Sequence, residues 1–198
     1  MSQPAEPAVL AHYHREGLAE RILAAARQQG IDPLTPAALA PADHFHSYGL
    51  RATRDLATAA GLQPGQHVLD LGCGIGGPAR TIAAEFGCRL TGIDLSPEFI
   101  RTARILAEAC GLAHQCEFHV ANALQLPFPD ASFDAVITQH VAMNIADRAR
   151  FWSEARRVLR PGGTLALFDI IRGPNPEPLQ YPVPWASEPA ISHLLTED

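Results

Sequence analysis

The chain has 198 residues, of which 47% are apolar and 18% are charged, as expected for one soluble domain with its own core. A formal net charge of −6 argues against a surface for nucleic acid. The polar, proline-containing residues 1–6 and the lack of a long apolar run predict neither a secretory signal nor a membrane span, so we expect a cytoplasmic protein.

The first 61 residues read as a helical cap. We predict a helix over residues 9–29, ending at Gly30, and a second helix over residues 47–60, closed by Gly61. Pro33, Pro36 and Pro41 punctuate the stretch between them, which favours a linker.

From residue 62 to residue 172, strands alternate with helices. The predicted strands cover residues 66–71, 88–93, 115–120, 133–138 and 164–171, and the predicted helices lie near residues 79–86, 97–110 and 147–159. Ser96 is the expected N-cap of the second of these helices, and a turn at residues 161–163 precedes the last strand. Such alternation predicts an α/β fold with a doubly wound, mostly parallel, Rossmann-like sheet.

Residues 173–198 differ in character, because six prolines between positions 174 and 189 break any regular element. This region is either a linker or a loop that folds over a pocket.

The four cysteines have neither a CxxC pair nor a zinc-like spacing with histidine. We interpret Cys88, Cys110 and Cys116 as reduced packing residues. The nine histidines form no HxxxH pattern and no histidine–carboxylate cluster, so we expect no metal site.

A glycine-rich turn follows the first predicted strand. Residues 72–77 match the GxGxxG pattern, with Asp94 about 20 residues further on, as a ribose-binding acid would be. The pattern fits a dinucleotide, another nucleoside ligand, or a turn that serves only helix–strand packing.

Asp70, at the end of the first strand, discriminates between these ligands. A carboxylate there would repel a pyrophosphate but attract the sulfonium and ammonium groups of S-adenosylmethionine. Asp70 therefore favours a cationic nucleoside, and the alternative is that it caps neighbouring loop amides.

Four blocks together resemble the class I S-adenosylmethionine-dependent methyltransferases, in that family's order. They are residues 68–76, 92–94, 126–134 and 157–163. Residues 43–46, 76–80 and 139–147 carry a narrower similarity to the small-molecule branch that includes sarcosine/dimethylglycine-type and ubiquinone- or tocopherol-type methyltransferases.

The resemblance implies S-adenosylmethionine as methyl donor and a methyl transfer to a nitrogen or oxygen of a small molecule by in-line displacement. It implies that Asp70 serves the methionine end and that Asp94 binds both ribose hydroxyls. The other implied donor contacts are Gly72, Cys73, Gly74 and Gly76 in the turn, Leu95 on the adenine ring, Asn122 and Ala123 at the adenine edge, and Gln139. The family usually has an acid where Asn122 stands, but an amide oxygen can still accept from an adenine amino group.

His140 is the candidate general base, because it directly follows the fourth strand and imidazole titrates near neutral pH. The alternatives are a histidine that only forms hydrogen bonds, or an amine acceptor that needs no base. His44, Phe45, His46 and Tyr48 fit either a pocket wall or a surface linker.

The family sheet normally continues with a helix and an antiparallel hairpin, whereas this sequence ends at Asp198. The predicted sheet therefore lacks the hairpin, and strand 164–171 becomes an apolar edge through which copies could associate. This departure keeps open an alternative function, a donor-binding but inactive fragment or regulatory partner. A nicotinamide-dependent oxidoreductase is disfavoured by Asp70.

Overall fold

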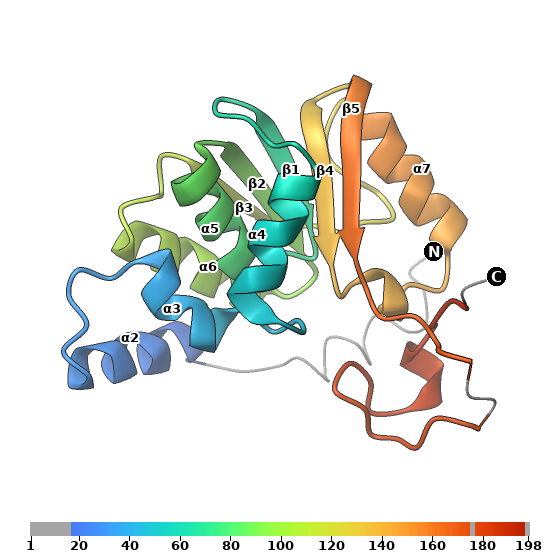
Figure 1. Cartoon of the computed structure of the whole chain (residues 1–198), viewed down its shortest axis with the longest axis horizontal. Coiled ribbons are helices and arrows are strands. Elements are labelled where there is room, and N and C mark those ends of the chain that lie inside the picture. The colour runs from blue at the N-terminus through green and yellow to red at the C-terminus, as the bar shows by residue number, and fades with distance from the viewer. Residues whose placement is uncertain (1–16, 175–176, 197–198) are drawn as a thin grey trace.

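The computed structural model describes residues 17–174 and 177–196. Its centre is a five-stranded, fully parallel sheet with the strand order β3-β2-β1-β4-β5 (Figure 1). The strands are β1 His67–Leu71, β2 Arg89–Asp94, β3 Cys116–Val120, β4 Phe133–Gln139 and β5 Leu159–Phe168. The predicted doubly wound, Rossmann-like sheet is confirmed.

The described helices are α2 Leu18–Gln28, α3 Pro36–Asp43, α4 Gly49–Ala59, α5 Gly77–Phe86, α6 Pro97–Ala109 and α7 Arg148–Val158, with short 3-10 helices η1 Ala142–Asn144 and η2 Pro189–Ile191. Ser96 caps α6 as predicted, since its Oγ accepts a hydrogen bond from the Phe99 amide at 3.2 Å. None of the helices in the described ranges is both long and apolar enough to cross a membrane.

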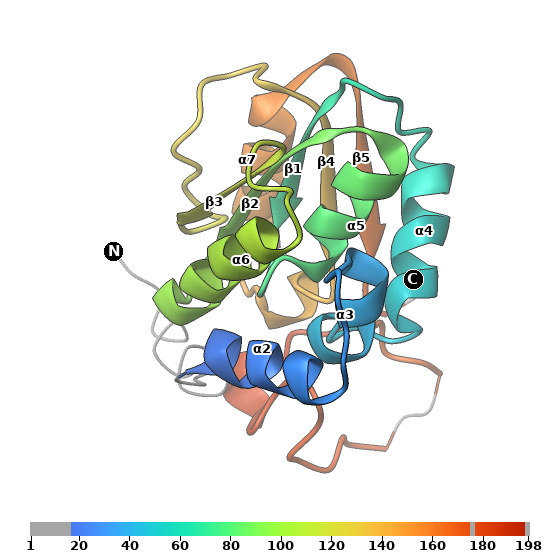
Figure 2. The same ribbon diagram turned by 90° about the vertical axis from the view of Figure 1, so that its left-hand side faces the viewer.

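Alternating side chains of the strands build a core on each face of the sheet. On β1, Val68 packs toward α4, α5 and α6, whereas Leu69 and Leu71 pack toward α7. Figure 1 shows α4 in front of the sheet, and Figure 2 shows α4 and α7 on opposite sides of it. A third apolar cluster joins α2, α3 and α6 around Leu39 and Phe99.

The linker prediction for residues 30–46 was wrong, because this stretch contains α3. Pro36 occupies the first turn, where a missing N–H costs nothing, and the Thr35 hydroxyl caps the helix by accepting from the Ala38 amide at 3.2 Å. Pro41 lies inside this short helix. Of the predicted helix 9–29, residues 18–28 are helical and residues 9–16 lie outside the described residues.

The last strand also differs from its prediction. β5 begins at Leu159 and ends at Phe168, three residues before the expected end, and it includes the predicted turn. Its register with β4 jumps from Leu159 to Thr164, so the residues between them bulge out of the ladder. β5 is an edge strand in the described sheet, with Leu165 37% and Leu167 51% exposed.

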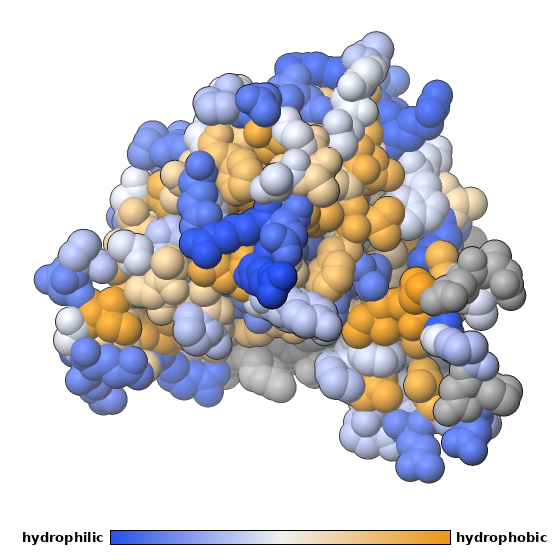
Figure 3. Space-filling model, viewed as in Figure 1, coloured by the Kyte–Doolittle hydropathy of each residue, from blue (hydrophilic) through white to orange (hydrophobic). Residues whose placement is uncertain are grey.

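All five strands point toward one end of the molecule, where α2, α3 and residues 177–196 lie (Figures 1 and 2). We call residues 177–196 the C-terminal segment. The outward face of α4 is charged, with Arg54 and Asp55 at the surface, and it is blue in Figure 3. Orange surface gathers where the C-terminal segment meets the sheet (Figure 3), and Ile171, Leu179 and Leu195 are among the exposed apolar residues.

Candidate active site

A cavity of about 400 Å³ lies at the carboxyl edge of the sheet, the place where parallel α/β folds bind ligands. Its walls come from α3 and the residues after it, from the turns after β1, β2, β3 and β4, and from the C-terminal segment. Of the site residues predicted from sequence, nine lie in its lining: Asp70, Gly72, Cys73, Gly74, Asp94, Leu95, Asn122, Ala123 and Gln139, together with the candidate base His140.

The glycine turn after β1 leaves no room for a side chain at Gly72. Gly72 has φ +71°, and a Cβ there would lie 2.4 Å from Cγ2 of Val141. Gly74 has φ +53°, also in the left-handed region. The turn is fixed to the sheet by the Cys73 amide, which donates to the Ile93 carbonyl at 2.9 Å. Bare backbone therefore faces the cavity at this point.

Gly76 is absent from the cavity lining among the described residues. A Cβ on it would meet Phe118 Cζ at 2.8 Å and Arg80 Nη1 at 3.0 Å. The structure thus gives Gly76 a packing reason, and its predicted contact with a ligand stays a prediction.

Asp70 is buried within β1, and its Oδ2 has no hydrogen-bond partner among the described residues. Burial, together with the nearby Asp94 carboxylate, raises the pKa of Asp70 to about 7. The alternative that Asp70 caps loop amides leaves this oxygen unexplained. A buried carboxyl oxygen without a donor fits a cationic ligand.

Asp94 is held differently. Its Oδ2 accepts from the Gly74 amide at 3.1 Å, and its Oδ1 accepts from the Ser96 amide at 2.9 Å. Burial nevertheless raises its pKa above the ordinary value. These two amides orient the carboxylate at the end of β2, one strand away from Asp70.

Asn122 lies after β3, and its Oδ1 accepts from the Leu124 amide at 2.8 Å. This contact orients the Asn122 side chain at the cavity, which Asn122 lines. The loop that carries Asn122 and Ala123 is anchored through Leu126, whose amide donates to Glu154 Oε2 at 2.8 Å.

His140 follows β4 with a left-handed backbone (φ +55°), a conformation that favours glycine or asparagine and that clusters at functional sites. Its backbone N–H donates to the Phe168 carbonyl at 2.8 Å, and its ring lies 5.2 Å from the Phe168 ring. The side-chain Nε2 is buried with no described partner. Burial lowers the pKa of His140, partly offset by Asp169, so the imidazole is neutral near pH 7.

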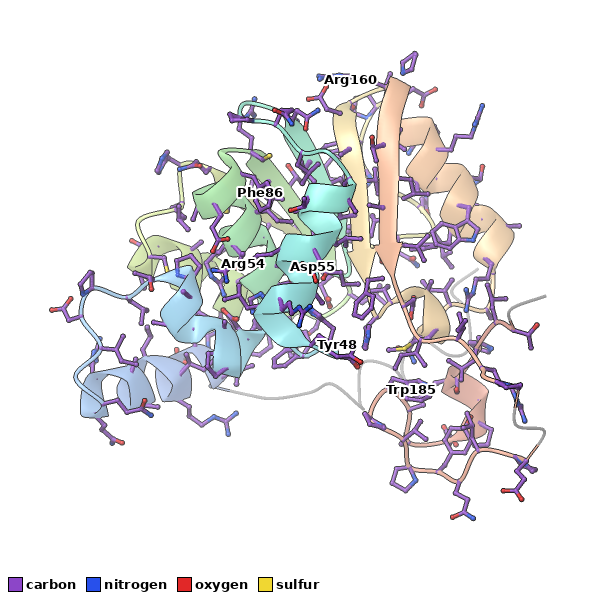
Figure 4. All side chains as sticks on the ribbon, in the orientation of Figure 1. Tyr48, Arg54, Asp55, Phe86, Arg160 and Trp185 are labelled. Carbon is purple, nitrogen blue, oxygen red and sulfur yellow. The ribbon has the colours of Figure 1, made fainter. Side chains whose placement is uncertain are left out.

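Some of the residues at and after the end of α3 line the cavity, and others make only structural contacts. His46 and Phe45 line the cavity, whereas His44 and Tyr48 are not among the lining residues. His44 Nδ1 donates to Asp43 Oδ1 at 2.6 Å, and Arg80 Nη2 donates to Asp43 Oδ2 at 2.7 Å, all three side chains being fully buried. Tyr48 is 80% exposed near the start of α4 (Figure 4).

Sequence reasoning missed Thr53 on α4. His46 Nε2 lies 3.1 Å from the Gly49 carbonyl, which can only accept, so this nitrogen carries the proton. The same N–H reaches Thr53 Oγ1 at 3.2 Å, and the Thr53 hydroxyl then donates to Gln139 Oε1 at 3.2 Å. This relay fixes the Gln139 amide, whose Nε2 is buried with no described partner. Its signal in the sequence is only one threonine on an amphipathic helix.

The C-terminal segment folds over the pocket, as one of the two readings of its sequence expected. Pro184 and Trp185 line the cavity (Figure 4). Asn144 Nδ2 donates to the Trp185 carbonyl at 2.9 Å and to the Ile191 carbonyl at 2.7 Å, and the His193 amide donates to the Met143 carbonyl at 2.7 Å. These hydrogen bonds attach the C-terminal segment to η1.

Two further expectations concern cysteine and metal. The four cysteines are free, and burial raises the pKa of the cavity-lining Cys73 thiol well above its ordinary value. Within residues 17–174 and 177–196, no three His, Cys, Asp or Glu side chains come together as metal ligands would.

Comparison with known proteins adds a family. The model of the family described as "Methyltransferase domain" matches residues 69–167. The chain is 40% identical over 114 residues to the sterol 24-C-methyltransferase ERG6B of Gibberella zeae (58% of this chain, 30% of that protein). It is 44% identical over 100 residues to the chloroplastic tocopherol O-methyltransferase of Arabidopsis thaliana (50% of this chain, 29% of that protein).

Among solved structures, phosphoethanolamine N-methyltransferase 2 of Haemonchus contortus, in complex with S-adenosyl-L-methionine, superposes with a TM-score of 0.60 at 25% identity. The match covers 74% of this chain and 35% of that one. The chain thus spans about a third or less of these three relatives, whose names specify a carbon, an oxygen and a nitrogen acceptor.

Proposed function

The chain belongs to the class I S-adenosylmethionine-dependent methyltransferases, and from that premise we propose that it methylates an oxygen or nitrogen of a small molecule. The observation that carries the proposal is the buried oxygen of Asp70, which has no partner among the described residues, beside a turn in which Gly72 has no room for a side chain. At an effective dielectric constant of 20, a unit charge about 4 Å from a carboxylate gains or loses about 4 kcal/mol. A bound sulfonium would be stabilised by this amount, whereas a bound pyrophosphate would be destabilised by it.

Different residues of the cavity would bind different parts of S-adenosylmethionine. Asp70 would balance the charge of the methionine end, and Asp94, oriented by two loop amides, would accept from the ribose hydroxyls. Leu95 would pack on the adenine ring, with Asn122 and Ala123 at its edge. At Gly72, Cys73 and Gly74 the backbone would approach the bound S-adenosylmethionine closely. The side-chain amide of Gln139, held by Thr53, would donate a hydrogen bond to the same molecule.

S-adenosylmethionine supplies a methyl group already activated by its sulfonium. The protein must then align the acceptor, exclude water and remove a proton where the acceptor carries one. The C-terminal segment closes the cavity from one side, and neutral His140 is placed to accept the proton. Because the segment supplies Pro184 and Trp185 to the lining, it favours an active enzyme over a chain that only binds the donor.

The same proposal covers organisation and location. We place the functional boundaries near residues 61 and 172, with residues 1–61 as cap, 62–172 as donor-binding core and 173–198 as pocket cover. We expect a cytoplasmic enzyme that binds no nucleic acid and has no membrane span. The exposed leucines of β5 support self-association along that edge.

Isothermal titration with S-adenosylhomocysteine tests the donor site. We expect saturable binding, and we expect Asp94→Ala to weaken it at least about tenfold because two ribose hydrogen bonds are lost. Asp55→Ala is the matched control, since Asp55 lies on the charged outer face of α4 with its side chain 71% exposed. Binding of NAD in place of S-adenosylhomocysteine by the folded protein would overturn the proposal.

A further inference from the structure

The cavity has two chemically different ends. We propose that the end formed by His140, Met143 and Trp185 is an acceptor site for an uncharged, mainly apolar molecule that offers a hydroxyl group to His140 Nε2. This inference rests on the proposed methyl transfer and narrows it to oxygen. The names of the relatives do not decide the acceptor, because they specify three different elements.

The distribution of charge is the first support. No lysine, arginine or glutamate lines the cavity in the described part of the chain, so an anionic acceptor has no partner there. Its carboxylates are Asp43, Asp70 and Asp94. The last two lie at the glycine turn, and Asp43 is occupied by Arg80 and His44. The carboxylate near His140 is Asp169, which does not line the cavity and whose two oxygens accept from the Met143 and Ile170 amides at 3.2 and 2.8 Å. In the described part of the chain, a cationic acceptor at this end therefore meets no carboxylate in the lining, and burying it unpaired is costly.

The walls of this end are apolar and aromatic. Met143, Ile170 and Trp185 line it from η1, from the residues after β5 and from the C-terminal segment. Phe45 lies instead beside the glycine turn, since a Cβ on Gly74 would be 3.8 Å from its ring. Hydrogen bonds hold both the side chain and the backbone of Trp185. Its Nε1 donates to Ser192 Oγ at 3.1 Å, and its carbonyl accepts from Asn144. A flat apolar body fits between such surfaces.

His140 is the hydrogen-bond acceptor that we propose for this end, whereas the Nε2 of His46 is engaged as a donor. The Nε2–H of His46 is committed to Gly49 and Thr53, and burial lowers the pKa of His46 to about 4. The Nε2 of His140 is buried and has no described partner, while the Phe168 and His46 rings hold its plane. A neutral imidazole nitrogen in this setting accepts from a hydroxyl.

The chemistry balances with these groups. The acceptor oxygen forms the bond to the methyl carbon, the carbon–sulfur bond breaks with its electron pair left on sulfur, and the hydroxyl proton goes to His140 Nε2. Solvent then takes the proton from the imidazolium, which burial disfavours. An aliphatic ammonium would first have to lose a proton, and the neighbouring His46, whose pKa is lowered to about 4, is a weak base for that step.

The test is calorimetric and uses the full chain saturated with S-adenosylhomocysteine. Saturation itself checks the proposed function, so a failure there is distinct from a failure at the acceptor end. Three probes share one apolar body: 2-naphthalenemethanol, 2-naphthylmethylammonium and 2-naphthoate. We expect the alcohol to bind at least about tenfold more tightly than either ion. Equal or tighter binding of the ammonium or the carboxylate would overturn the inference.

Two variants sharpen the test. Asn tolerates the left-handed backbone of residue 140, so His140→Asn should keep the turn while weakening binding of the alcohol about three- to tenfold. The methyl ether of the same alcohol, which has no hydroxyl, should bind this variant and the parent equally. A loss of the same size for alcohol and ether would contradict a hydrogen bond to His140.

Trp185→Ala should weaken all the naphthalene probes about tenfold, since the apolar wall is lost. Leu179→Ala, in the same segment but outside the lining, is the control and should leave binding unchanged. Unaltered binding by Trp185→Ala would remove Trp185 from the proposed site.

Discussion

The two ends of the cavity are built in opposite ways. The end at the glycine turn comes mainly from residues 70–96, which are one strand, its turn and the neighbouring strand, with Phe45 beside Gly74 and Asn122 and Ala123 after β3. The acceptor end draws on His46 and on residues 139–145, 170 and 184–185, which only the folded chain brings together. The first is rigid backbone around two carboxylates, and the second is a set of side chains held by few long-range hydrogen bonds. The glycine-turn end therefore follows from the fold, whereas the acceptor end depends on the particular sequence of this chain.

The largest expected effect tests the rigidity of the glycine turn. Gly72→Ala should lower the free energy of unfolding by about 2–5 kcal/mol, since left-handed strain of about 1–2 kcal/mol adds to overpacking of about 1–3 kcal/mol against Val141. S-adenosylhomocysteine binding should be lost with it. Urea denaturation and calorimetry measure the two effects.

Gly111→Ala is the matched control. Gly111 has φ +70°, nearly the same as Gly72, but nothing within 4 Å of a Cβ. It should show the strain without the clash. Equal losses in the two variants would mean that close packing at the turn contributes nothing.

The second prediction concerns charge at the same end. The pKa of Asp70 is raised from 3.8 to about 7, so the folded state binds this proton more tightly than the unfolded chain does. The free energy of unfolding should therefore fall as pH rises from about 4 to about 7, by up to about 4 kcal/mol for this group alone. Asp70→Asn should flatten that fall, which is measured as the difference between variant and parent because Asp94 and the histidines titrate as well.

The same carboxylate can also be tested by ligand binding, for which its ionised form is the favourable one. S-adenosylmethionine should bind about tenfold more weakly to Asp70→Asn than to the parent at pH 8, whereas S-adenosylhomocysteine, which lacks the sulfonium charge, should lose less. The preference of the parent for the charged ligand should decline below about pH 7. A constant preference across this range would show that Asp70 does not sense the sulfonium.

The smallest effect probes the relay behind Gln139, where the two ends meet. Thr53→Val should cost about 1–3 kcal/mol of stability, because it leaves the His46 N–H short of one acceptor and the Gln139 oxygen without its donor. Thr81→Val is the control, since the Thr81 hydroxyl is buried with no described partner and its removal should be neutral or stabilising. Similar costs for both would assign the effect to packing and not to the relay.

The sequence predicted the glycine-turn end well because that end is local. Strand alternation, the Ser96 cap and the positions of Asp70 and Asp94 all follow from short-range patterns. α3 was missed because Pro36 and Pro41 suggest a break, although a proline in a first turn is compatible with a helix. The acceptor end depends on contacts over tens of residues, such as Asn144 with Trp185, for which no spacing rule exists.

The buried pair of Asp43 and Arg80 also determines which wall of the cavity can open. Arg80 ties α3 to the glycine turn, since its Nη1 donates to the Ile75 carbonyl at 2.8 Å while its Nη2 holds Asp43. Lifting α3 would strip a fully buried guanidinium of its counter-charge, whereas displacing the C-terminal segment breaks a few hydrogen bonds at η1. Amides of residues 183–193 should therefore exchange hydrogen faster than those of α3, and the reverse order would refute this. On this basis we expect acceptor and product to enter and leave beneath the C-terminal segment, while α3 stays in place.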